Sequence, residues 1–346
     1  MRFAPTAQQV ELATAVRELL ADACPPETVR AAWGSEGEKA RVDLWRQLAD
    51  LGLLGAVLPE ADGGLGLTEV DLVPLMVEVG RAAVPLPVAE TVAVLVPLLA
   101  GRPGDGDDLT GLVTGNLVGT AELAGSGVLP WAGCSDRALV RSGSELRLVD
   151  LTGVPLELVT TVDGSRAAAR TPQLPGTLLS TDPADLERAW LRGALATAAQ
   201  LVGLVHRQLD LAVAHAAARK QFGVPIGSQQ AVKHMLADVL LDVRFALPVV
   251  QRAAVSLAAG APEARAHVAA AKAMASRAAD RAARTTIQAH GAIGYTVEYD
   301  LHLYVKRAWA LADTWGSETH SRAVVADSLG LPPAVDPSVL PWEAAR

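Results

Sequence analysis

The chain has few of the residues that hold small secreted domains together. Two cysteines, Cys24 and Cys134, occur in 346 residues, too few for a disulfide framework. The sequence begins with Met-Arg-Phe-Ala-Pro-Thr and lacks the continuous apolar stretch of a secretory signal there. We therefore expect a soluble protein of a reducing compartment, located in the cytoplasm.

Long apolar runs and blocks of basic charge are also missing. The most apolar windows, such as residues 92–100, are short and carry Pro97, whereas a membrane-spanning helix needs about 20 apolar residues. The net charge is −8, and no block of Lys and Arg occurs. Neither a membrane nor a nucleic acid is therefore expected as a partner.

Several common site motifs are absent as well. The sequence has no CxxC pair, no glycine-rich phosphate loop and no Ser/His/Asp arrangement. The histidines of the predicted helices have no carboxylate partners at ligand spacing, so we expect no metal site. These histidines are His206, His215, His267 and His290.

What the chain does have is apolar periodicity. Half of its residues are apolar, enough for two or three packed units. Residues 1–105 predict an N-terminal helical domain, and residues 106–180 show short alternating runs that predict a small, mostly antiparallel β domain. Residues 181–330 predict a C-terminal four-helix bundle, followed by a tail over residues 331–346. The fold class is therefore mainly α with a small β domain. The four bundle helices are expected over residues 186–218, 230–258, 262–291 and from 304 onward.

The stretch Ala218–Ile226, A-R-K-Q-F-G-V-P-I, ends the first bundle helix. An arginine directed out of a helix end, here Arg219, can form a two-pronged contact with a phosphate, and Gln221 adds a donor. The alternative interpretation of this stretch is a solvated basic helix end.

A second stretch, Ile287–Lys306, favours the phosphate site. Together the two stretches resemble the C-terminal domain of the flavin-dependent acyl-CoA dehydrogenases. The family's R-x-Q-F-G is followed by a helix with the pattern Q-A-x-x-H-x-L-A-D, which is matched here by Gln230, Ala231, His234, Leu236, Ala237 and Asp238. The family's Q-x-x-G-G-x-G-[YF]-T-x-E-Y is matched by Gln288, Gly291, Gly294, Tyr295, Thr296, Glu298 and Tyr299. Ala292 stands where the family usually has its second Gly.

This resemblance implies the acyl-CoA dehydrogenase fold, FAD as the cofactor and an acyl-CoA thioester as the substrate. In the family each flavin lies across a subunit interface. One subunit holds the flavin ring, and its neighbour contributes the Arg motif and the Gln-Gly helix to the ADP portion. The residues expected on this ADP side are Arg219, Gln221, Phe222, Gln230, Gln288, Gly291 and Ala292.

The resemblance is weaker in the β domain, which is abbreviated. The family's T-E-P-x-A-G-S-D loop is at best echoed by residues 121–127. The W-I-T-[NS] strand, whose Trp shields the flavin ring, has no counterpart, because Trp131 is followed by Ala-Gly-Cys. We therefore expect the half-site for the flavin ring to be degraded.

The desaturation implied by the family needs a carboxylate base in a dry pocket and a flavin as hydride acceptor. Counted from the matched motifs, the family's two base positions fall on Trp315 and Gly193, neither of which can accept a proton. We therefore predict no catalytic residue. Glu318, Asp313 and Glu187 are lesser alternatives for the base.

An intact ADP side without a base resembles the short non-catalytic subunits of actinobacterial heteromeric α2β2 acyl-CoA dehydrogenases, which act on bulky acyl-CoAs such as steroid side chains. The resemblance implies a heterotetramer in which this chain completes the FAD site of a catalytic partner. Two alternatives stay open. One is a self-sufficient homo-oligomeric dehydrogenase with an unconventional base, and the other is a catalytically dead binding or scaffold homologue.

Overall fold

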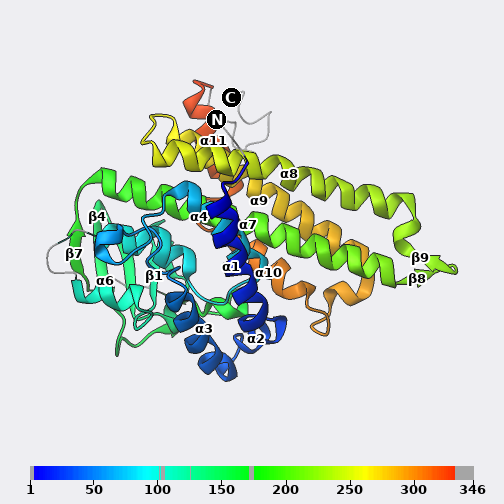
Figure 1. Ribbon diagram of the computed structural model, residues 1–346, viewed down its shortest axis with the longest axis horizontal. Helices are drawn as coiled ribbons and strands as arrows, with labels where there is room; N and C mark the ends of the chain where they lie inside the picture. Colours follow the sequence, from blue (N-terminus) through cyan, green and yellow to red (C-terminus); the bar gives the residue numbers. More distant parts are fainter. Residues whose placement is uncertain (1–3, 101, 103–105, 125, 171–174, 332–346) are drawn as a thin grey trace, which may run out of the picture.

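The computed structural model describes residues 4–100, 102, 106–124, 126–170 and 175–331. The tail predicted over residues 331–346 therefore lies outside the described residues, apart from its first position. Long helices run between a small sheet at one end of the molecule and a short hairpin at the other (Figure 1). The predicted fold class, mainly α with a small β region, is confirmed.

The N-terminal region is helical, as predicted. Its helices are α1 (Ala7–Ala23), α2 (Pro26–Ala31), α3 (Glu38–Asp50), α4 (Glu69–Arg81) and α5 (Val96–Leu99), and a π-helical stretch (Glu90–Leu95) precedes α5. The Thr6 side chain accepts a hydrogen bond from the Gln9 backbone N–H while the Gln9 side chain bonds the Thr6 backbone, which fixes the start of α1.

The β region begins with a helix, α6 (Gly106–Val113), within the stretch expected to form strands. A four-stranded sheet follows in the order β1-β3-β4-β7, made of Gly119–Glu122, Arg137–Ser142, Glu145–Asp150 and Thr177–Ser180. A three-stranded sheet has the order β2-β6-β5, made of Val128–Leu129, Ala169–Arg170 and Glu157–Leu158. All of these pairs are antiparallel except β1 with β3.

The C-terminal region is a helical bundle of α7 (Pro183–Ala218), α8 (Gln230–Ala258), α9 (Ala264–His290), α10 (Leu301–Asp313) and α11 (Glu318–Ser328). The expectation of one helix from Tyr304 onward was wrong. The chain breaks between α10 and α11, where Trp315 and Gly316 have φ of 59° and 98°, outside the helical region. Pro262 also precedes α9 rather than beginning it.

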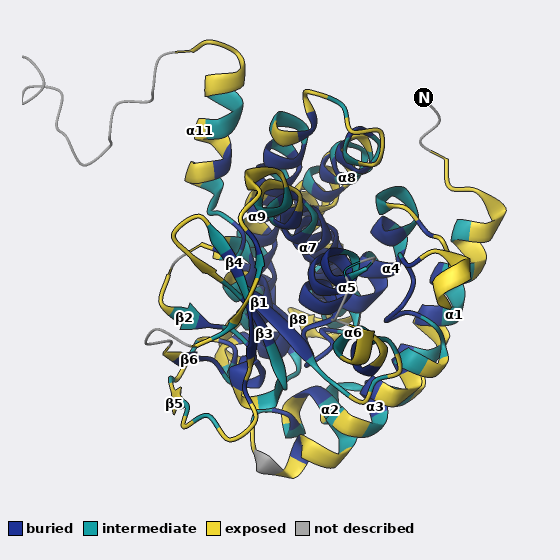
Figure 2. Cartoon of the chain, turned by 90° about the vertical axis from the view of Figure 1, so that its left-hand side faces the viewer, coloured by how far each residue is buried: buried dark blue, intermediate teal, exposed yellow. Residues whose placement is uncertain are grey.

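Two glycines bring α4 and α7 into backbone contact. A Cβ on Gly80 would lie 2.0 Å from the carbonyl oxygen of Gln200, and one on Gly203 would lie 1.9 Å from that of Val77. Real Cβ contacts are never this short, so only glycine fits at either position. The close crossing packs α7 into the core, where most of its middle part is buried (Figure 2).

Candidate functional site

The Arg motif lies at the exposed end of the bundle. Arg219 is the C-terminal cap of α7, and the next residues form a hairpin of β8 (Lys220–Gln221) and β9 (Val224–Pro225). The two turn residues, Phe222 and Gly223, have φ of 52° and 82°. Positive φ at both central positions is what a tight two-residue hairpin requires.

The Arg and Gln motifs meet at this end of the molecule. His215 lies in the last turn of α7, and its ring stacks on that of His290, the last residue of α9, with 4.4 Å between centroids. The Tyr299 ring lies 4.8 Å from His290. Burial lowers the pKa of both histidines, so the pair packs as neutral rings at neutral pH.

The predicted ADP-side residues all face outward. Phe222 is 97% exposed, and the Arg219 guanidinium has no ion-pair partner among the described residues. Gln230 begins α8, with its side-chain nitrogen 3.4 Å from His234 Nε2. The exposed members of this set are Arg219, Gln221, Phe222, Gln230, Gln288, Gly291 and Ala292. A cation, three amides and an aromatic ring are thus available to a ligand that approaches from outside the chain.

A cavity of about 230 Å³, here called the inner cavity, lies between the β region, α7 and the α10–α11 turn. On its β-region side, the Glu122 carboxylate accepts hydrogen bonds from the Ser126 backbone N–H and hydroxyl, both at 3.1 Å. These residues belong to the stretch 121–127, which was compared above with the family's T-E-P-x-A-G-S-D loop. Gly125 of this stretch lies outside the described residues. The lining includes Glu122, Ser126, Arg166, Trp190, Asp313, Thr314 and Trp315.

Trp131 is not among the residues that line the inner cavity. It is 2% exposed, and its Nε1 donates to the Glu90 carboxylate at 3.3 Å. The guanidinium carbons of Arg166 and Arg307 lie 5.6 and 5.0 Å from its ring centroid. Trp131 is therefore a core residue between two cations.

Sequence reasoning missed the buried ionic network around Trp131. Arg307 of α10 pairs with Asp163 and donates to the carbonyl oxygen of Val84 at 2.7 Å and to Ser165 Oγ at 2.6 Å. Burial alone would raise the pKa of Asp163, but Arg307 and Ser165 hold it below its usual value. Burial raises the pKa of Glu90. The network joins the N-terminal helices, the β region and α10.

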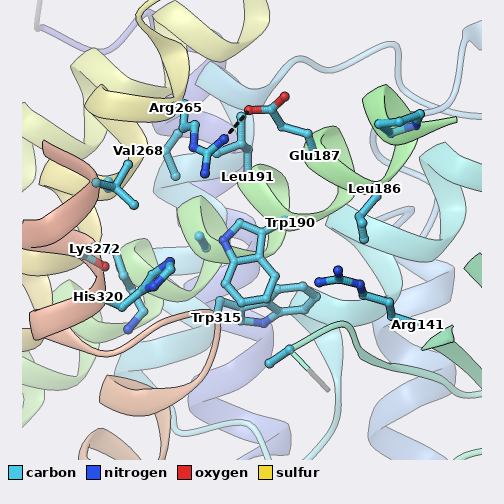
Figure 3. Close-up of a pocket in the computed structure, with 16 residues that line it drawn as sticks. Arg141, Leu186, Glu187, Trp190, Leu191, Arg265, Val268, Lys272, Trp315 and His320 are labelled. Carbon is cyan, nitrogen blue, oxygen red and sulfur yellow. Dashed lines mark ion pairs between the residues drawn. The ribbon is translucent and has the colours of Figure 1, made fainter. Parts of the chain in front are cut away.

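The two predicted base positions, Gly193 and Trp315, are in contact with each other. A Cβ built on Gly193 would lie 2.6 Å from ring atoms of Trp315, so the indole packs directly on the α7 backbone. Trp315 is 6% exposed, and the Trp190 ring meets it edge-on at 5.7 Å (Figure 3). Its Nε1 is buried without a hydrogen-bond partner among the described residues. Neither residue offers a proton acceptor, and together they fill the position.

The three alternative carboxylates occupy three different places around this contact. Asp313 is exposed and lines the inner cavity. Glu318 begins α11, with Oε1 3.4 Å from Arg322 Nε. Glu187 lines a second cavity of about 450 Å³, the outer cavity, and pairs with Arg265 at 3.7 Å (Figure 3). Their use as the base stays a prediction.

The described part of the chain contains no group of three or more His, Cys, Asp and Glu side chains placed to hold a metal ion. No described helix is both long enough and apolar enough to cross a membrane.

Comparisons with known proteins agree with these motifs. Residues 6–101 match the model of the acyl-CoA dehydrogenase N-terminal domain, and residues 186–330 match that of the C-terminal domain. The chain is 35% identical over 305 residues to acyl-CoA dehydrogenase IpdE2 of Mycobacterium tuberculosis. The aligned stretch covers 88% of this chain and 92% of the relative. The chain belongs to the acyl-CoA dehydrogenase family. This membership confirms the predicted oxidoreductase class and FAD as the cofactor.

Two solved structures that resemble this acyl-CoA dehydrogenase chain contain pairs of proteins. The Tcur3481–Tcur3483 steroid ACAD variant has a TM-score of 0.82 at 26% identity, with 93% of this chain and 98% of the other covered. The ChsE4–ChsE5 complex of Mycobacterium tuberculosis has a TM-score of 0.80 at 23% identity, with 96% and 100% covered. The second likeness shows the fold alone.

Proposed function

We propose that this chain is the non-catalytic subunit of a heteromeric acyl-CoA dehydrogenase and supplies the ADP side of the FAD site to a catalytic partner. The observation that supports the proposal is the contact of Trp315 with Gly193, since these are the two positions predicted for the base and neither carries a carboxylate.

Desaturation removes the α-proton of the acyl thioester to a base, and bound FAD supplies the acceptor for the β-hydride. In this chain Trp315 cannot be that base, because an indole N–H only donates. Gly193 has no side chain. The base of the complex is therefore a carboxylate of the partner.

On the ADP side, Arg219 would hold the FAD diphosphate through a two-pronged contact, and Gln221 would add a hydrogen bond. Gln230 and Gln288 would bind the remaining polar groups of the ADP portion. Gly291 has no side chain and would let the end of α9 approach the cofactor closely. The residues fit this role because they are exposed and face outward. A flavin whose ring is held by another chain can reach them without entering this one.

The resembling structures support a partner of the same family. Tcur3481–Tcur3483 and ChsE4–ChsE5 each name two proteins, and the first is described as a steroid ACAD. We infer an α2β2 heterotetramer that acts in the cytoplasm on a bulky acyl-CoA of the steroid side-chain type. The partner would be a longer dehydrogenase that keeps its glutamate base.

The proposal is tested by purifying the chain alone and together with a candidate partner encoded beside it. We expect a colourless or unstable chain alone and a yellow, active complex. A yellow chain that turns over acyl-CoA alone would favour the self-sufficient homo-oligomer. A complex that forms without flavin would favour the scaffold homologue.

A further inference from the structure

The turn that carries Trp315 needs something to hold it. Between α10 and α11 the chain passes through Trp315 with φ of 59° and Gly316 with φ of 98°. A left-handed conformation is unfavourable for a bulky residue such as Trp, and it persists only where the surroundings impose it. The carbonyl groups at the end of α10 also need donors, because a helix leaves its last carbonyls unpaired.

Lys272 of α9 meets both needs. Its side chain is fully buried, and its Nζ donates to the carbonyl oxygens of Ala312 at 2.6 Å and Gly316 at 2.9 Å. Its third hydrogen bond goes to Ser276 Oγ at 3.0 Å, and that hydroxyl donates to the same Ala312 oxygen at 3.2 Å. The two carbonyl contacts lie on either side of Trp315, so one buried amino group holds both sides of the turn.

Trp315 lines two cavities. The inner cavity and the outer cavity share the lining residues Ala124, Trp190 and Trp315. Figure 3 shows the two indoles together in the middle of the outer cavity's lining, with Lys272 to one side. Trp315 rests on Gly193 and meets the Trp190 ring edge-on, so it lies at the boundary that the two cavities share.

We propose that Lys272 is a positioning residue that fixes the α10–α11 turn, so that the Trp315 ring stays in place as a partition between the inner and outer cavities. Without Lys272 the turn relaxes, the ring leaves Gly193, and the two cavities connect into one chamber open to apolar ligands. The inference concerns the chain alone and holds whether or not the chain is the non-catalytic subunit, so each can fail separately.

The test follows Trp315 directly by fluorine NMR of the full chain labelled with 5-fluorotryptophan. The sequence has seven tryptophans, and the Trp315 resonance is assigned by its loss in Trp315→Phe. In Lys272→Met we expect this resonance to shift and broaden, since the ring becomes mobile. Lys233→Met is the matched control, because it removes the same charge from an exposed position on α8 and should leave the resonance unchanged.

A second readout is the binding of an apolar fluorescent dye, 1-anilinonaphthalene-8-sulfonate. Trp315→Ala should increase dye binding by joining the cavities. Lys272→Met should increase it too, but should add nothing in the Trp315→Ala background, because both changes act on the same partition.

The proposal is overturned if folded Lys272→Met keeps the wild-type Trp315 resonance, or if its gain in dye binding is additive with that of Trp315→Ala. Should Lys272→Met fail to fold, Ser276→Ala removes one acceptor of the ammonium while keeping both carbonyl contacts. We then expect a smaller shift of the same resonance, and an unshifted resonance contradicts the proposal.

Discussion

Replacing Trp315 by Glu places a carboxylate at a predicted base position, but it should not create a second active site. Truncating a buried Trp costs about 3–5 kcal/mol. Part of this cost is offset. The Trp315 Nε1 is buried without a hydrogen-bond partner in the described structure, and the substitution removes this unpaired group, which costs about 1–3 kcal/mol. The new carboxylate would face the Gly193 backbone and the Trp190 ring, where desolvation raises its pKa. We expect a net loss of about 1–4 kcal/mol in the free energy of unfolding.

Urea unfolding at constant m measures the loss as a lower midpoint. Trp315→Phe is the control, since it keeps an aromatic ring on Gly193 and should lose less. Active sites per complex are counted by titration with a tight-binding acyl-CoA analogue, and we expect the same count in Trp315→Glu as in the wild type. A doubled count of turnover-competent sites, or a stability equal to wild type, would refute the reasoning.

Three further results are expected. Arg219→Ala should lower the flavin absorbance per complex after gel filtration with unchanged circular dichroism, since a charged hydrogen bond contributes about 1.5–3 kcal/mol; unchanged flavin would remove Arg219 from the site. Gly203→Ala should lower the free energy of unfolding by at least about 1–3 kcal/mol, because its Cβ would lie 1.9 Å from the carbonyl oxygen of Val77; a neutral effect would contradict the close crossing. Burial lowers the pKa of Lys272 to about 7, from a usual value of 10.5. Between these values the unfolded chain holds a proton that the folded chain lacks. The free energy of unfolding of wild type relative to Lys272→Met should therefore rise with pH above 7, with a slope of about 1.4 kcal/mol per pH unit between pH 8 and pH 9. A flat difference would be inconsistent with the lowered pKa.

The sequence predicted those structural features that depend on residues close together in the chain. The ends of α7 and α8 lie within three residues of the predicted helix ends, because Arg219 and Pro225 interrupt the apolar periodicity. The break at Trp315 was missed because it depends on Lys272, whose contact with Gly316 spans 44 positions of the sequence. The β8–β9 hairpin was missed because Phe222-Gly223 lacks the Asn or Asp that usually marks such a turn.

The buried pair of Arg307 with Asp163 could not be predicted either. The two residues are 144 positions apart, and nothing in the local pattern of either indicates burial. The family resemblance predicted the ADP-side residues and two base positions separately. Only the structure brings the two predicted base positions, Gly193 and Trp315, into contact.

The most direct test of the central claim is the flavin content and turnover of the chain with and without its partner. We expect no flavin and no turnover for the chain alone. In the complex we expect one FAD for each pair of chains, and turnover that disappears when the partner's glutamate base is changed to Gln. Changing Asp313, Glu187 or Glu318 of this chain to the matching amide should leave turnover intact. Flavin-dependent turnover by the chain alone, lost on changing one of these three carboxylates, would contradict the account.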